Sequence, residues 1–563
     1  MKVVQRLEFK DVFPDEETKP VEEYLKQVSG DTLLQTIGFC STSPSTNFDN
    51  FFSSPPLQRD IYDRVVDYSR RNGISEKPEV ISKYASLKLT EQILSNKELA
   101  KNKLVSIDQN ELNIFKAFLV INGELNNSQR LDNIEGDAFE RLVDYTLIFK
   151  FPESDLALFD NDSFEFLKLI HCTIYKVEML FVFLDSKDEF KELKNKLIKS
   201  FQVKDEAEFL YQMKYLFGQL LHSKTTLNYK FRLVDNLSVD FLKSMVSEDI
   251  KADEDFTHLK NSPIYFLGDN TFSIVNYFFA IDKFFRSAKF KLKEFYLEDK
   301  ILKKIYGDYF GFYNKHFSEN FLMKKILDEI FEKNYYVKKP DTDTELDGEP
   351  DYYIRHNNTV YLFENKDVLV AKAIKSSANI EEINTFLKSK FLYDGEKHVG
   401  IGQLINGVEE ILQKKFRFDD YVNTKNNLEI YPVLIIQDRI FQSPGINYRL
   451  NKWYFKSLQD RLGGKFNISR VKGLTVIDID TLIAWIPYLK AKNQNLKNVI
   501  TDHLKRMQTI KKINVPNVKE GYDRAHKLLR EQTTAISYRE VPFTIDPEHF
   551  IEKFADVFPE TKS

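Results

Sequence analysis

Two carboxylates and a lysine near the middle of the chain have the types and spacing of a site that binds a cation. Glu364 follows Asp351 by thirteen positions, and Lys366 stands two positions later. Carboxylate oxygens are the ligands that Mg²⁺ and Mn²⁺ prefer. The chain has only two cysteines and no histidine pair at metal-binding spacing, which argues against zinc. The combination indicates a site for a hard divalent cation.

The dipeptide Asn357-Asn358 predicts the hairpin that would bring these side chains together. Counting outward from this two-residue turn puts Asp351 directly opposite Glu364. Opposed residues project from the same face, about 4.5–5.5 Å apart at Cβ, and two carboxylates at that distance repel. Lys366 shares this face because side chains alternate along a strand. We therefore expect a divalent cation to turn the repulsion into binding free energy.

A third acid is expected on the helix before the hairpin. In HFSENFLMKKILDEIFEKN (316–334), apolar residues follow Glu319 at three- and four-residue spacing. Glu319 therefore shares the apolar face of an amphipathic helix. It either stabilises the first turn through the helix dipole or faces the metal site, and both interpretations stay open at this stage.

The acids from Asp341 to Glu349 occupy every second position before the hairpin. Counted from Asp343, they resemble an EF-hand calcium loop, but Ile354 stands where a bidentate glutamate is required, and a strand follows. We expect a solvated loop instead. Only Asp347 and Glu349 are near enough to the hairpin to take part in a site.

The surrounding elements predict a mixed α and β core. After the helix at 316–334, three short strands are expected, then two helices, a buried strand and a last strand that runs into a helix. These segments are NYYVKK, EPDYYIRH, TVYLFENKDVLV, IEEINTFLKSKFL, GQLINGVEEILQKKF, NLEIYPVLIIQD and GLTVIDIDTLIAWI. The order helix, three-strand meander, helix, strand is typical of α+β or α/β domains.

This order, with Pro350-Asp351 and Glu364-Asn365-Lys366, resembles the PD-(D/E)xK nucleases, which share the restriction-endonuclease-like fold. The resemblance covers roughly residues 305 to 490. It implies metal-dependent hydrolysis of phosphodiester bonds, most simply in DNA, in a role such as bacterial defence against phage or restriction. Asp351, Glu364 and the backbone carbonyl of Asn365 would bind Mg²⁺ or Mn²⁺.

The resemblance also implies further catalytic roles. Lys366 would orient or activate the attacking water, and Glu319 would be an auxiliary acid. In some branches of the family a Gln on the next helix assists, followed four residues later by Tyr. Gln403 matches the first residue, but Gly407 stands in place of the second. Two rivals remain: a catalytically inactive interaction protein with the same fold, and a ribonuclease toxin.

The composition is consistent with a cytoplasmic chain of two or more domains. Among 563 residues, 81 Lys and Arg nearly balance 85 Asp and Glu, so binding to nucleic acid must depend on local patches. Two cysteines exclude a disulfide framework. No apolar run approaches the roughly 18 residues of a membrane span, and the N-terminus lacks a signal-peptide core. We expect no membrane partner.

The chain divides into four expected parts. The first, mostly helical part carries no chemical motif and is expected to supply target recognition, a protein-partner or homo-oligomer contact, or regulation. In the second, Lys289, Lys291 and Lys293 alternate as on an edge strand. In the last, the run from Lys505 to Arg530 holds eight Lys or Arg against two acids, which suits phosphate contacts or a solvated helix face equally. The parts are residues 1–255, the connecting segment 256–304, the nuclease-like domain 305–495, and the basic helical tail 496–563.

Overall fold

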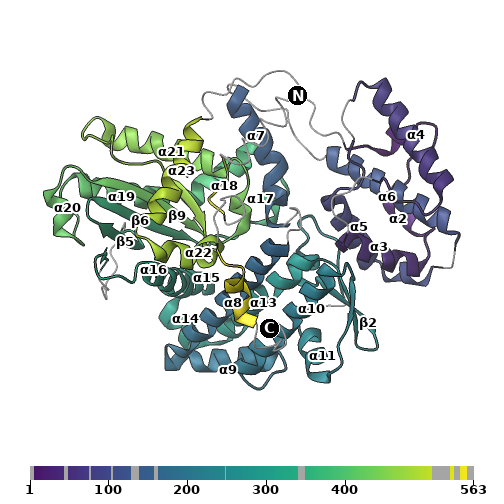
Figure 1. The fold of residues 1–563 in the computed structure, drawn as a ribbon, viewed down its shortest axis with the longest axis horizontal. Coiled ribbons are helices and arrows are strands. Elements are labelled where there is room, and N and C mark those ends of the chain that lie inside the picture. Colours follow the sequence, from purple (N-terminus) through teal and green to yellow (C-terminus); the bar gives the residue numbers. More distant parts are fainter. Residues whose placement is uncertain are drawn as a thin grey trace.

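The computed structural model combines many helices with three small sheets among the residues it describes (Figure 1). The described residues are 6–42, 48–74, 78–102, 105–127, 138–156, 163–246, 249–339, 349–509, 533–537 and 545–554. Mixed α and β structure is thus confirmed in general terms. Within the described residues, no helix has both the length and the apolar character that crossing a bilayer requires.

A five-stranded mixed sheet lies at the centre of the second half of the chain. Its strand order is β10-β9-β6-β5-β4. The first three strands along the chain form an antiparallel meander, as the sequence predicted, and the last two join it in parallel. The strands are β4 (Val337–Lys338), β5 (Tyr352–His356), β6 (Thr359–Lys366), β9 (Glu429–Ile436) and β10 (Thr475–Asp478).

The hairpin of β5 and β6 has the register expected from its turn. His356 pairs with Thr359 across that turn. Asn357 has a φ of 52°, a left-handed conformation that Asn tolerates better than most residues. Asp351 lies one position before β5, so the same register sets it across from Glu364.

Helices cover both faces of this sheet, as Figure 1 shows. Alternate residues of β6 enter two different cores: Tyr361 and Phe363 belong to the first, and Val360 and Leu362 to the second. The first core includes α8 (Ser163–Asp185), α13 (Tyr277–Glu298), α16 (Lys324–Ile330) and α22 (Ile479–Ala491). The second includes α7 (Ala138–Lys150), α18 (Ile380–Phe391), α19 (Ile401–Leu412) and α21 (Ile446–Leu458).

The first helices form a separate lobe, purple in Figure 1, to one side of the sheet. Its core is a third apolar cluster, which residues between Ile250 and Phe279 complete. The lobe contains α1 (Phe9–Val12), α2 (Val21–Leu25), α3 (Gly30–Thr42), α4 (Pro55–Arg71), α5 (Lys83–Ser95), η1 (Lys97–Lys101) and α6 (Ile107–Asn127).

The segment from Lys289 to Lys293 is helical, so the edge strand expected there is wrong. It lies inside α13, where Phe284, Ala288 and Leu292 are buried at four-residue spacing. The alternating lysines masked this helical period. Around α13 stand η2 (Phe151–Leu156), η3 (Asp188–Phe190), α9 (Lys191–Ser200), α10 (Glu206–Thr225), α11 (Asn236–Lys243), α12 (Thr257–Asn261) and the small sheet of β1 (Lys230–Arg232), β3 (Thr271–Ile274) and β2 (Ile264–Gly268).

The helix expected at 316–334 is present but starts earlier and is wound more widely. After α14 (Lys300–Tyr306) and α15 (Tyr309–Phe312), the chain continues as a π-helix, η4 (Tyr313–Met323), and then as α16. The Lys324 N–H donates to the Glu319 carbonyl, a five-residue step. π-helical turns are rare and occur frequently at functional sites.

The remaining elements are short helices, a two-stranded sheet and the last described segments of the chain. Residues 510–532, which hold most of the basic run from Lys505 to Arg530, lie outside the described residues. Ile536 returns to pair with Ile477 of β10. The elements are α17 (Lys372–Ser376), β7 (Tyr393–Asp394), β8 (Lys397–His398), α20 (Asp420–Thr424), η5 (Arg439–Gln442), η6 (Gln459–Gly463), α23 (Asn495–Thr509), α25 (Glu548–Ile551) and η8 (Glu552–Phe554).

Candidate active site

Asp351, Glu364 and Lys366 come together where β5 begins and β6 ends. The Lys366 ammonium lies 2.8 Å from Glu364 Oε1. Asp351 Oδ2 accepts a 2.7 Å hydrogen bond from the backbone N–H of Asn365, the residue between them. The hairpin register therefore brings the three side chains into one cluster, on the sheet face that packs against α19.

The Glu364 carboxyl group is buried in an unusual electrostatic environment. It has no exposed surface, and its Oε2 has no hydrogen-bond partner. Burial, followed by the charge of Asp351, raises the pKa of Glu364 to about 8, although Lys366 acts in the opposite direction. A buried carboxylate oxygen without a partner is costly, so this group requires either a proton or a cation.

Lys366 stays protonated in this cluster. Burial alone would lower the pKa of Lys366, but the carboxylates of Glu364 and Asp351, with a smaller contribution from Glu319, raise it above its ordinary value. Its side chain keeps 20% of its surface exposed, and its ammonium lies 3.3 Å from Gln403 Oε1. An ammonium this firmly charged can orient water and offset negative charge, but it is a poor general base.

Two residues at the start of α19 hold Lys366 in place. Gln403 Oε1 also accepts a 2.8 Å bond from the Gly400 N–H, which fixes the amide that faces the ammonium. Gly400 has a φ of +52°, and a Cβ there would lie 3.3 Å from Lys366 Cε and 3.0 Å from the Phe391 carbonyl oxygen. Only glycine leaves room for the lysine. The sequence pattern pointed to Gln403, whereas the role of Gly400 was missed.

Glu319 lies beside the cluster rather than on the buried face that helical spacing predicted. It is half-buried inside η4, and its charge helps raise the pKa of Lys366. The helical run begins at Tyr309, so the interpretation that Glu319 stabilises a first helical turn is wrong. The wider π turns move it from the position that a 3.6-residue period would give.

The donor set fits a hard divalent cation that keeps much of its water. Glu364 offers the oxygen without a partner, and Asp351 lies next to it. Among the described residues, no group of three or more His, Cys, Asp or Glu side chains is arranged to hold a metal ion. Two carboxylates suffice for Mg²⁺, which is commonly held by one or two of them together with water and substrate phosphate.

Asn365 and Asp367, which alternate with Glu364 and Lys366 along the chain, point to the other face of the sheet. Asn365 Oδ1 accepts a 2.7 Å hydrogen bond from Gln437 at the end of β9. Asp367 pairs with Lys289 of α13 at 2.9 Å and accepts a bond from Ser318 of η4. This second layer fixes the end of β6, and sequence patterns gave no signal for it because its members are far apart in the chain.

Glu349 takes part in a different cluster. It is buried and pairs with Lys339 at 3.0 Å and with Arg417 at 2.6 Å, so the solvated loop expected here does not extend to it. Asp347 and the acids before it, back to Asp341, lie outside the described residues.

The raised pKa of Glu364 predicts how metal-free protein responds to pH. Unfolding returns Glu364 to an ordinary pKa near 4.5, so between about pH 4.5 and 8 the native state binds more protons. Stability should therefore fall as pH rises through this window, by up to about 1.4 kcal/mol per pH unit. The pKa of Lys366 lies above this pH window, so the charge of Lys366 does not change within it. In chelator, Glu364→Gln should flatten the dependence of the melting temperature on pH. An unchanged slope in this variant would contradict the electrostatic description.

Comparisons with known proteins found no relative of this chain. No protein-family model, curated protein or solved structure matches it.

Proposed function

We propose that the chain is a metal-dependent nuclease that hydrolyses phosphodiester bonds, with DNA as its first expected substrate. The observation that carries this proposal is the fully buried Glu364 carboxyl group, whose Oε2 lacks a hydrogen-bond partner beside Asp351 and Lys366. The order of strands and helices around it agrees with the resemblance to PD-(D/E)xK nucleases. A role in restriction or phage defence remains a prediction from that resemblance.

Each side chain would have a distinct task. Asp351 and Glu364, with the Asn365 carbonyl, would hold Mg²⁺ or Mn²⁺, which would stabilise charge on the phosphate and on an attacking water. The Lys366 ammonium, held by Gln403, would donate to that water or to a phosphate oxygen. The charge of Glu319 helps keep Lys366 protonated.

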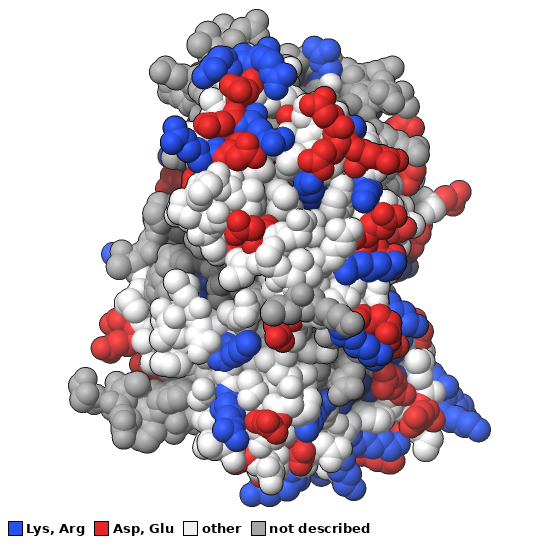
Figure 2. Space-filling model, turned by 90° about the vertical axis from the view of Figure 1, so that its right-hand side faces the viewer, with Lys and Arg blue, Asp and Glu red and all other residues white. Residues whose placement is uncertain are grey.

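The face of the first lobe that Figure 2 shows is not built as a general nucleic-acid surface. In Figure 2, which faces this side of the molecule, the Lys and Arg side chains of the described residues are interspersed with Asp and Glu, and neither sign forms a continuous field. The net charge of −4 agrees with weak nonspecific attraction to nucleic acid. We therefore propose that the lobe recognises a specific target or partner, or regulates activity.

The proposal is tested by cleavage assays with the full-length protein. Plasmid DNA, single-stranded DNA and RNA are incubated separately with Mg²⁺, Mn²⁺ or excess chelator. We expect DNA cleavage with either metal and none in chelator. At pH 8, Mg²⁺ should also raise the melting temperature of the wild type but not of Glu364→Gln, since the cation replaces the missing proton.

Other outcomes would redirect the assignment. Cleavage that is undiminished in chelator would remove the metal from the mechanism. Cleavage of RNA alone would favour the ribonuclease. Mg²⁺ binding without cleavage of any substrate would favour an inactive interaction protein with this fold.

A further inference from the structure

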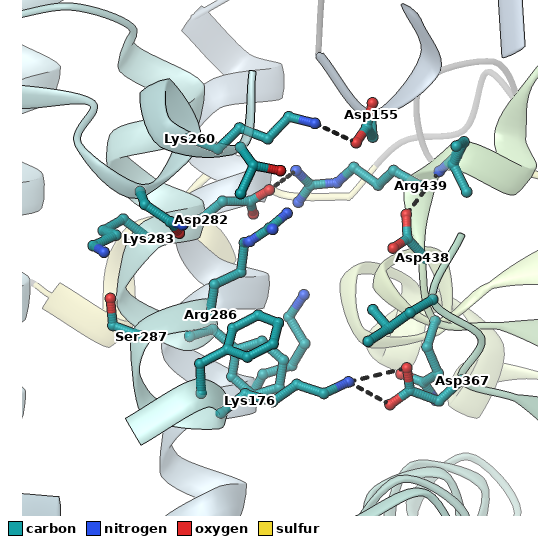
Figure 3. Close-up of a pocket in the computed structure, with 18 of the residues that line it drawn as sticks. Asp155, Lys176, Lys260, Asp282, Lys283, Arg286, Ser287, Asp367, Asp438 and Arg439 are labelled. Carbon is teal, nitrogen blue, oxygen red and sulfur yellow. Dashed lines mark hydrogen bonds and ion pairs between the residues drawn. The ribbon is translucent and has the colours of Figure 1, made fainter. Parts of the chain in front are cut away.

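A cavity of about 750 Å³ opens beyond the end of β6, on the face opposite Lys366. Figure 3 shows its lining: α13 forms one wall, and the ends of β6 and β9 form the other with Asp367, Asp438 and Arg439. The catalytic carboxylates are not among its lining residues. Its volume is within the range of pockets that bind small organic ligands.

Most of the cations in this cavity are neutralised by nearby carboxylates. Such pairs hold the cavity walls together and leave little charge for a ligand. The pairs are Lys260 and Lys375 with Asp155 (both 2.6 Å), Arg439 with Asp282 (2.8 Å) and Asp480 (3.1 Å), Lys176 with Asp480 (2.8 Å), and Lys289 with Asp367 (2.9 Å).

Arg286 and Lys283 on the α13 wall are different. Among the described residues, neither has a carboxylate within ion-pair distance. Arg286 extends from α13 toward the wall that carries Asp438 and Arg439 (Figure 3), and its Nε is buried without a hydrogen-bond partner. The neighbouring Ser287 hydroxyl is buried and also lacks a partner. Buried hydrogen-bond donors normally have an acceptor, so this wall of the cavity lacks acceptors for its donors.

The nearby charges make this shortage costly. Burial, with added repulsion from Arg286 and Lys291, lowers the pKa of Lys283 to about 8. Burial also lowers the pKa of Lys260 to about 8 despite Asp155, and Arg286 contributes to that shift. The Asp438 carboxyl group interacts with the charge of Arg286, but burial raises the pKa of Asp438 and so disfavours its charged form. Buried positive charges that destabilise the free protein are typical of a binding site whose ligand supplies the opposite charge.

We propose that this cavity binds a phosphate-bearing small molecule of nucleotide size, with Arg286 of α13 facing the phosphate and Lys283, one helical turn away, adding positive charge. Arginine donates charge-assisted hydrogen bonds to phosphate oxygens. Phe285 and Phe290 also line the cavity and offer apolar surface to a base or another ring. This proposal does not depend on the nuclease assignment.

A free ligand suits the cavity better than the backbone of a nucleic acid. Two of the lysines that line it are almost inaccessible: Lys260 and Lys375 are 4% and 3% exposed. A duplex is too wide to enter a cavity of this volume, so its backbone phosphates would stop at the rim. A mononucleotide can enter alone.

Ligand-induced stabilisation of the full-length protein in chelator tests the proposal. Inorganic phosphate, AMP, ATP and short single-stranded and duplex oligonucleotides are compared by thermal melting and calorimetry. We expect AMP or ATP to raise the melting temperature, and Arg286→Met to weaken their binding by about 10- to 100-fold. Lys304→Met, on the exposed side of α14, is the matched control and should bind as the wild type does.

The ligand-free variants separate a binding role from a structural one. Because Arg286 lies near other cations and its buried Nε has no hydrogen-bond partner, Arg286→Met should melt at the same or a higher temperature than the wild type. If Arg286→Met misfolds, Lys283→Met examines the same wall. The proposal is overturned if no compound stabilises the wild type, if both variants keep full affinity, or if only oligonucleotides bind.

Discussion

Lys366→Met should reduce cleavage by about 10²–10⁴-fold while leaving the protein folded. The loss follows from the geometry, because the ammonium is the only cation that directly contacts Glu364 among the described residues and no neighbouring lysine can replace it. The fold should survive because Glu364, whose pKa is about 8, can take up a proton when its partner is removed. Methionine keeps the length of the side chain that packs against Gly400.

Metal binding separates this effect from simple damage to the site. Removing a cation beside Asp351 and Glu364 should leave Mg²⁺ binding intact or strengthen it, so Lys366→Met should still be stabilised by Mg²⁺ at pH 8. Asp351→Ala should lose both cleavage and this stabilisation. Lys390→Met, exposed on α18, is the control. Wild-type cleavage by Lys366→Met would refute the assigned role.

A fragment that starts at residue 256 should fail to fold cooperatively. It would lack α8, which packs against α13, η4 and α22 within the same apolar core as the sheet. Side chains of α8 such as Ile170, Val177 and Leu184 are fully buried there. Exposing the apolar partners of these side chains costs about 25 cal/mol for every Å². Summed over the contacts of α8, this cost exceeds the small free energy of unfolding of a marginally stable domain.

A fragment that starts at Ala138 should retain its fold. It keeps α7 and α8 and therefore both cores that border the sheet, although the residues between Ile250 and Phe279 that complete the core of the first lobe become exposed. Circular dichroism and thermal melting of the two fragments distinguish them. A cooperative transition in the 256–563 fragment would contradict the shared core. The 138–563 fragment also tests whether the first lobe regulates cleavage. If the fragment and the full-length protein have equal cleavage rate, substrate preference and toxicity, the lobe has no such role.

The hairpin and its neighbours could be predicted because their signals are local. Asn357-Asn358 fixed the register of β5 and β6, and apolar runs marked β9 and β10. The lysines of α13 misled because a two-residue alternation and a helical period fit the same short window, and only the buried Phe284, Ala288 and Leu292 distinguish them.

Other parts of the site could not be predicted from local patterns. The position of Glu319 depends on π-helical turns, which a 3.6-residue period cannot anticipate. Gly400 matters only because the strand that carries Lys366 passes beside it, and the pair Asp367–Lys289 joins residues far apart in the chain. Contacts of this kind arise from tertiary packing and leave no periodic trace in the sequence.

The packing of α8 against α22 also has a consequence for synthesis on the ribosome. Roughly 300 residues separate the end of α8 at Asp185 from the start of α22 at Ile479. At about 5–20 residues per second, translation of that interval takes about 15–60 s. During this time the apolar side of α8 has no access to α22, so the nascent chain should depend on chaperones more than a protein with local contacts does. The cluster around Glu364 likewise cannot assemble until β9 has left the ribosome, so any catalytic activity begins only near the end of synthesis.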